Sequence, residues 1–131
     1  MVQETGQAPL RWAPPNGYPD VAAAWASPSG QVLRWNNHLN IAAGWWPNQL
    51  VRPPSLLTEL AGPLPATYGE LIDAVARRLL HRTLPAAQTA ALAAFYGKTP
   101  ATRLRPSDGA AGWAFPYLVA LLLNSPSFAL R

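Results

Sequence analysis

The sequence contains no cysteine and only one lysine, Lys98, and it is poor in valine and isoleucine. Without cysteine the chain has no disulfide, no zinc–thiolate site and no cysteine nucleophile. The scarcity of β-branched residues argues against a large sheet, because these residues favour strands. The longest apolar run, residues 115–123, is too short to span a bilayer, which takes about 20 residues. The start of the chain lacks the basic region and the apolar run of a signal peptide.

The abundant residues predict a helical protein. Half of the 131 residues are hydrophobic, and alanine and leucine, which favour helices, dominate them. The 15 prolines lie mostly outside the periodic segments and therefore indicate stiff, irregular connections. We predict a single all-α domain in which an extended, proline- and tryptophan-rich segment (residues 1–26) precedes a small bundle of about four helices (residues 27–131).

The first long helix is expected from Pro28 to about Gly44. Ser27 is a good N-cap, and proline fits the first helical position. Apolar residues recur at helical spacing and predict one buried face, made of Val32, Trp35, Leu39 and Ala42 or Ala43. Poor helix formers inside this helix either face solvent or make specific hydrogen bonds; they are Asn36, Asn37, His38 and Asn40.

Three further helices are predicted. Thr67 and Glu70 form a capping box ahead of a buried stripe made of Leu71, Ile72, Val75, Leu79 and Leu80. Another helix is expected over residues 85–96. The last is expected over residues 113–124, with its proline in the first turn. In the long loop between the first two helices, residues 55–60 are expected to form a brief helical turn.

The charged residues argue against a nucleic-acid partner and against a bound metal. The net charge of +4 comes from scattered arginines, whereas a nucleic-acid footprint needs positive charge gathered on one face. We therefore interpret the arginines as solvated helix faces and expect no nucleic-acid partner. The two histidines and six acidic residues show no metal-ligand spacing, and no phosphate-binding loop is present. We predict no metal and no cofactor.

Several short motifs, taken in order, resemble one bacterial family. They are Gly17-Tyr18-Pro19, Trp25, Ser27-Pro28, Leu33-Arg34-Trp35-Asn36 and the ending over residues 121–128. In these motifs and their spacing, the chain from about residue 12 to residue 131 is similar to the C-terminal part of DUF1800, a large family of unknown function.

The resemblance implies a mostly helical fold and an exported bacterial protein, although no signal peptide is evident in this chain. Family members are several times longer, which implies that this chain corresponds to their C-terminal part. A face that normally packs against the missing part would then be exposed, and it would bind a partner or self-associate. The resemblance carries over no catalytic or binding residue.

Five of the six tryptophans lie in the first 46 residues and mark a candidate binding site. A tryptophan is large and its N–H group needs a partner, so such a cluster either closes a core or lines a site. The candidate binding residues are Tyr18, Trp25, Arg34, Trp35, Asn36, Trp45 and Trp46. Trp45 and Trp46 stand beside Asn48 and Gln49, which pairs stacking faces with amides and suits a glycan or a small apolar ligand. Alternatively, one of the two tryptophans fills the core and the other covers the surface.

Asp20 and His38 form the candidate catalytic pair. A carboxylate, an imidazole and amide donors within an apolar wall are what general acid–base hydrolysis needs. The simpler interpretation makes Asp20 the cap of a short helical turn and His38 a half-exposed helix residue. Arg34 can pair with Asp20 or stack on a tryptophan.

We therefore expect a non-catalytic helical binding module, the C-terminal part of a larger exported assembly, that acts through protein or glycan contacts. The alternative is a small hydrolase of an ester, lactone or glycoside, with Asp20 and His38 as acid–base residues. The two hypotheses are separated by whether Asp20, His38 and a tryptophan face converge on one concave surface.

Overall fold

The computed structural model describes residues 27–129, which are mostly helical and contain no strand. The helices are α1 (Pro28–Ala43), α2 (Leu56–Ala61), α3 (Tyr68–Leu80), α4 (Ala86–Phe95), α5 (Phe115–Leu123) and α6 (Pro126–Ala129), and a 3₁₀ turn, η2 (Gly109–Ala111), precedes α5. The all-α prediction is confirmed, with four main helices and two short ones. The extended segment expected over residues 1–26 lies outside the described residues. None of the described helices is both long enough and apolar enough to cross a membrane.

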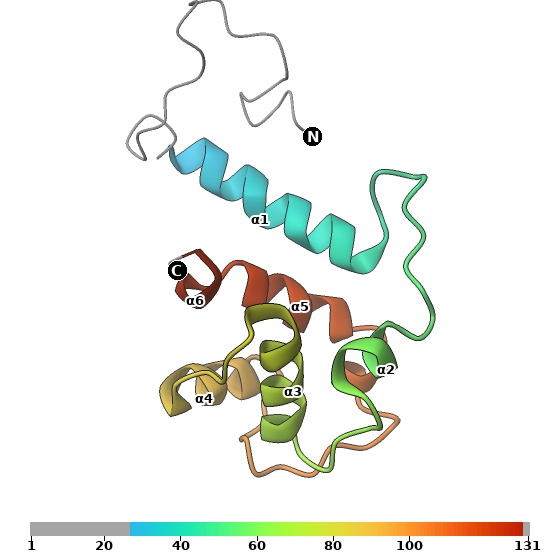
Figure 1. The fold of residues 1–131 in the computed structure, drawn as a ribbon, viewed down its shortest axis with the longest axis vertical. Coiled ribbons are helices and arrows are strands. Elements are labelled where there is room, and N and C mark those ends of the chain that lie inside the picture. The colour runs from blue at the N-terminus through green and yellow to red at the C-terminus, as the bar shows by residue number, and fades with distance from the viewer. Residues whose placement is uncertain (1–26, 130–131) are drawn as a thin grey trace, which may run out of the picture.

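Helix α5 lies at the centre of the arrangement. Helix α1 packs against it, and α3 contacts it from another side, so that α5 lies between the two (Figure 1). Helices α2 and α4 in turn pack against α3, and the short α6 follows α5 directly. Because α1 packs mainly on one helix, much of its surface has no neighbour among residues 27–129.

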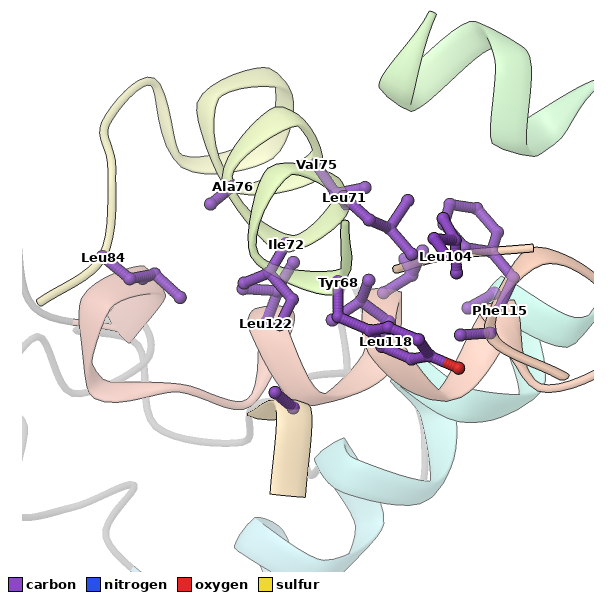
Figure 2. Close-up of a cluster of buried hydrophobic side chains, with 14 residues drawn as sticks. Tyr68, Leu71, Ile72, Val75, Ala76, Leu84, Leu104, Phe115, Leu118 and Leu122 are labelled. Atoms are coloured by element: carbon purple, nitrogen blue, oxygen red, sulfur yellow. The ribbon is translucent and has the colours of Figure 1, made fainter. Parts of the chain in front are cut away.

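The core forms where α3 faces α5. Figure 2 shows the side chains of α3 and α5 meeting between the two helices. Six of these side chains are fully buried, and they are Phe115, Leu71, Ile72, Leu118, Leu122 and Val75. Burying each large apolar side chain stabilises the fold by about 1.5–3 kcal/mol. Three residues of the predicted stripe on α3, Leu71, Ile72 and Val75, thus form the core together with α5, and Leu79 and Leu80 pack against it partly buried.

The start of α3 is stabilised by Thr67 and Glu70, the two residues from which this helix start was predicted. The Thr67 hydroxyl accepts from the Glu70 N–H at 3.2 Å. The Glu70 carboxylate reaches back to the N–H of Ala66 at 2.8 Å, one residue earlier than in the usual capping box. The loop after α4 also crosses this end, because the Gly69 N–H donates to the Pro100 carbonyl at 2.8 Å. A Cβ on Gly69 would lie 3.0 Å from that carbonyl oxygen, so glycine permits the close approach.

Helix α1 has the predicted bounds but not the predicted face. The Ser27 hydroxyl accepts from the Gly30 N–H at 3.0 Å and caps the helix. Val32, expected to be buried, is 52% exposed, and Trp35 is also exposed. Ala42 is buried as predicted, and the other buried residue of α1 is Asn37, which was not expected on the apolar face. The apolar-face prediction was wrong for Val32 and Trp35, because α1 rests mainly on α5 and this contact does not cover them.

Helix α5 begins at Phe115, two residues later than predicted. Pro116 lies in its first turn, where the missing N–H costs no helical hydrogen bond. Trp113 therefore precedes the helix in a turn and is 77% exposed.

Candidate binding site

Three exposed aromatic side chains converge on Tyr117. The ring centroids of Trp45, Phe95 and Trp113 lie 6.4, 6.2 and 6.2 Å from that of Tyr117. Trp45 is 57% exposed and Phe95 is 54% exposed. These separations are typical of aromatic pairs that contact through an edge or a tilted face. We call these four residues the aromatic cluster.

The end of α1 directs Trp45 toward α5. Gly44 adopts a left-handed conformation with φ of 68°, which ends the helix and turns the chain. The Trp45 N–H then donates to the Asn40 carbonyl at 3.0 Å. A Cβ on Gly44 would lie 2.8 Å from the Cβ of Arg52, so the returning loop depends on this glycine. Helix termination thus places the Trp45 ring against Tyr117.

Phe95 and Trp113 lie near the two ends of the segment that joins α4 to α5. Phe95 is the last residue of α4, and its ring lies edge-on to Tyr96 with the centroids 5.1 Å apart. The Tyr96 hydroxyl donates to the Ala114 carbonyl at 3.1 Å, which holds the end of α4 against the start of α5. This contact brings Phe95 and Trp113 close to one ring, that of Tyr117.

Two hollows adjoin the aromatic cluster and share Phe95 and Tyr117 as a common wall. The first hollow has a volume of about 460 Å³, and its lining includes Tyr68, Phe95, Lys98, Asp108, Trp113 and Tyr117. The second hollow has a volume of about 390 Å³, and its lining includes Trp35, Asn36, Leu39, Tyr117, Leu121 and Asn124. Volumes of about 300–1,000 Å³ are typical of ligand sites, so each hollow can hold a small ligand or one unit of a longer ligand.

The first hollow has a polar side formed by Asp108 and Lys98. The Asp108 carboxylate accepts from the Tyr68 hydroxyl and, through Oδ2, from the Arg105 N–H at 3.0 Å. Burial raises the pKa of Tyr68, and the charge of Asp108 and the hydrogen bond to it raise the pKa further. Tyr68 is therefore neutral at physiological pH and acts as a donor, which orients the carboxylate.

His38 connects α1 to the second hollow. Its Nδ1 lies 2.6 Å from the Oδ1 of Asn124, and its ring lies edge-on to Phe128 with the centroids 6.0 Å apart. Because an amide oxygen only accepts, Nδ1 carries the proton and donates it to Asn124. The bond occupies the carbonyl of the Asn124 amide and leaves its NH₂ group with donor capacity at the second hollow.

The structure distributes the predicted site residues unevenly. Trp35 and Asn36 line the second hollow, and Trp45 belongs to the aromatic cluster. Trp46 is exposed but is not among the lining residues of either hollow. Arg34 is exposed and donates to the Gln31 side chain. Three predicted residues lie outside the described part of the chain, so the catalytic pair stays a prediction; they are Tyr18, Asp20 and Trp25.

Sequence reasoning missed most of the candidate site, namely Tyr68, Phe95, Lys98, Asp108, Trp113, Tyr117, Leu121 and Asn124. Trp113 carried a usable signal, because a tryptophan close to the polar loop between two helices lies at the edge of the helical pattern. The adjacent pair Phe95-Tyr96 carried another, since two consecutive residues at a helix end cannot both face the core. Within residues 27–129, no group of three histidine or acidic side chains is arranged to hold a metal ion.

The fold and the site together define a small α-helical domain with an open aromatic face. The family model described as Protein of unknown function (DUF1800) matches residues 1–130. The chain belongs to this family, which confirms the resemblance seen in its motifs. Searches of the curated proteins and of the solved structures find no significant match. The function is therefore argued from the site itself.

Proposed function

We propose that this protein is a non-catalytic helical binding module whose ligand or partner binds on the aromatic cluster. The observation that carries the proposal is the convergence of Trp45, Phe95 and Trp113, each more than half exposed, on Tyr117 between two hollows. Leaving apolar surface in water costs about 25 cal/mol per Å². Contiguous exposed aromatic side chains are typical of interaction sites, where their burial on binding recovers this free energy.

The polar groups around the cluster support binding more than catalysis. Asp108 is held by the Tyr68 hydroxyl and a backbone N–H, and Asn124 is held by His38. Such fixed groups suit the orientation of a ligand. His38 is not among the residues that line either hollow, so its contact with Asn124 supports a positioning role.

The proposal is tested with the uncharged apolar dye Nile red and the full chain. We expect the dye fluorescence to rise to saturation as the dye binds. In Trp113→Ala the affinity for the dye should fall at least about fivefold, since a tenfold loss of affinity corresponds to only about 1.4 kcal/mol of binding free energy. Trp46→Ala is the matched control, since Trp46 is an exposed tryptophan outside both hollows. A compact monomer that binds no dye, or an equal loss in Trp46→Ala, would contradict the proposal.

The competing hypothesis, a small hydrolase that uses Asp20 and His38, is tested separately. It requires turnover of a nitrophenyl ester, a lactone or a nitrophenyl glycoside that disappears in both Asp20→Asn and His38→Gln while the helical circular dichroism is retained. We expect no such turnover. Activity lost in both variants but retained in Trp113→Ala would favour the hydrolase over the binding module.

A further inference from the structure

We propose that the occupant of the aromatic cluster is a neutral saccharide chain. One sugar ring stacks on Trp113 in the first hollow, and the chain continues across Phe95 and Tyr117 into the second hollow. This inference rests on the proposed function and adds the chemical class of the ligand.

The aromatic faces suit a sugar ring. Trp113 is 77% exposed and stands at the edge of the first hollow, so a flat ligand can cover it. A pyranose ring presents a face of C–H groups that carry a slight positive charge. This face is attracted to the negative face of an indole or phenyl ring, which a fully polar ligand is not. Trp113 and Phe95 thus provide a platform for the apolar face of a sugar.

The polar side of the first hollow suits hydroxyl groups. A carboxylate offers about four acceptor positions, and the structure gives Asp108 two donors, the Tyr68 hydroxyl and the Arg105 N–H. Asp108 therefore keeps acceptor capacity, while the ammonium group of Lys98 only donates. A vicinal pair of sugar hydroxyls donates and accepts at once and can use both groups.

The charge of the first hollow indicates a neutral ligand. Asp108 and Lys98 are its two charged lining residues, and their charges are opposite. A phosphate, a carboxylate or an ammonium ligand would meet attraction from one of them and repulsion from the other. Neutral hydroxyl groups gain from both charges, because hydrogen bonds to ionised groups are stronger than those between neutral groups.

The second hollow repeats this combination of groups without charge. Asn36 and Asn124 offer amides beside the apolar surfaces of Trp35 and Leu121. His38 holds the carbonyl of Asn124, so the NH₂ group of this amide remains to donate to a sugar oxygen. Because the two hollows share Phe95 and Tyr117, a chain of at least two sugar units is needed to occupy both.

Isothermal titration calorimetry of the full chain against defined oligosaccharides tests the inference. The neutral probes are cellohexaose, xylohexaose, laminarihexaose, maltohexaose and chitohexaose, and the acidic probe is hexagalacturonate. We expect at least one neutral probe to bind with a Kd of about 1 mM or tighter. Trp113→Ala should weaken this binding about tenfold or more, and Asp108→Asn about fivefold, while Trp46→Ala should change it by less than about twofold.

The possible results separate this inference from the proposed function. If every saccharide fails to bind while Nile red still binds in a Trp113-dependent manner, the saccharide inference is overturned and the binding module stands. Tighter binding of hexagalacturonate than of every neutral probe also overturns it, as does binding of a proline-rich peptide in place of all the saccharides. If neither the dye nor any saccharide depends on Trp113, both proposals fail. Circular dichroism of each variant shows whether a loss reflects misfolding.

Discussion

The two sides of helix α5 are built from the same kind of sequence and end in different environments. Toward α3, Phe115, Leu118 and Leu122 are buried at 2% exposure or less. On the other side, Tyr117, Leu121 and Asn124 are half-buried and line the second hollow. The difference lies in the neighbours, because α3 offers an apolar stripe, whereas the buried residues of α1 are Asn37 and Ala42 and its His38 bonds to Asn124 at the end of α5.

Under the proposed function, one side of the molecule provides stability and the other binds the ligand. A closed apolar contact contributes free energy of folding, while an open one retains surface for a ligand. The following substitutions separate the two roles, and they are ordered by the size of the expected effect.

The largest effect is expected in the core. Leu118→Ala removes a fully buried side chain between α5 and α3 and should lower the free energy of unfolding by about 2–5 kcal/mol. Leu121→Ala, on the half-buried side of the same helix, should cost about 1 kcal/mol because less surface and a smaller cavity are involved. Urea denaturation followed by far-ultraviolet circular dichroism measures both values. Equal losses would remove the distinction between the two sides.

The contact between α1 and α5 is expected to contribute less. Asn124→Ala leaves the Nδ1–H of His38 without its acceptor and should cost about 1–2 kcal/mol. A double-mutant cycle with His38→Ala isolates the pair, and we expect a coupling energy of about 1 kcal/mol. Strictly additive effects of the two substitutions would show that the hydrogen bond does not hold α1 in place.

The helix caps should show the same asymmetry on a smaller scale. Thr67→Ala removes the cap of α3 and should cost about 1 kcal/mol, because the first turn of α3 contains buried Tyr68 and Leu71. Ser27→Ala removes the cap of α1, whose first residues are exposed and can fray without disturbing the core. Denaturation in urea should therefore show less than about half the loss for Ser27→Ala. A larger loss for Ser27→Ala would contradict this ranking.

The smallest effect on the free energy of unfolding at neutral pH is expected from Tyr68 and Tyr96, which both line the first hollow. Burial raises the pKa values of Tyr68 and Tyr96 in the folded chain above the ordinary value of 10.0. The unfolded chain therefore loses these protons first as the pH rises, and the free energy of unfolding should decline above about pH 10. Below that pH neither group contributes to the pH dependence.

Tyr96→Phe should reduce this alkaline decline, because phenylalanine has no proton to lose. Denaturation midpoints measured on both sides of the tyrosine titration range provide the comparison. An unchanged alkaline decline in both Tyr68→Phe and Tyr96→Phe would show that the titration of these tyrosines does not control it.

The sequence alone could predict the elements but only part of the site. Caps and helical periodicity are local signals, so they predict where a helix lies. The position of α3 followed from Thr67, Glu70 and the apolar stripe, and that of α1 from Ser27 and Gly44. The buried face predicted for α1 was wrong at Val32 and Trp35, since the pattern does not reveal that α1 rests mainly on one helix. In the structure Trp35 and Asn36 line a hollow and Trp45 belongs to the aromatic cluster, whereas Trp46 does neither. Their roles as binding residues stay predictions.

The site residues that the sequence analysis did not find are brought together by tertiary packing. The ring of Tyr117 meets Trp45, Phe95 and Trp113 only because α4 ends beside the start of α5 and the loop after α1 returns to α5. No spacing in the sequence relates these positions to one another. The interpretation of the first 46 residues as the site therefore includes Trp35, Asn36 and Trp45 of the candidate site but not Phe95, Trp113 or Tyr117.

The most direct test of the central claim, that ligand binds on the aromatic cluster, is ¹⁹F nuclear magnetic resonance of the full chain labelled with 5-fluorotryptophan. Its six tryptophan signals are assigned by single Trp→Phe variants and followed during titration with Nile red and with the neutral hexasaccharide that binds most tightly. The account predicts that the signals of Trp113 and Trp45 shift with saturation while that of Trp46 stays in place. A saturable shift at Trp46 with no change at Trp113 would contradict it.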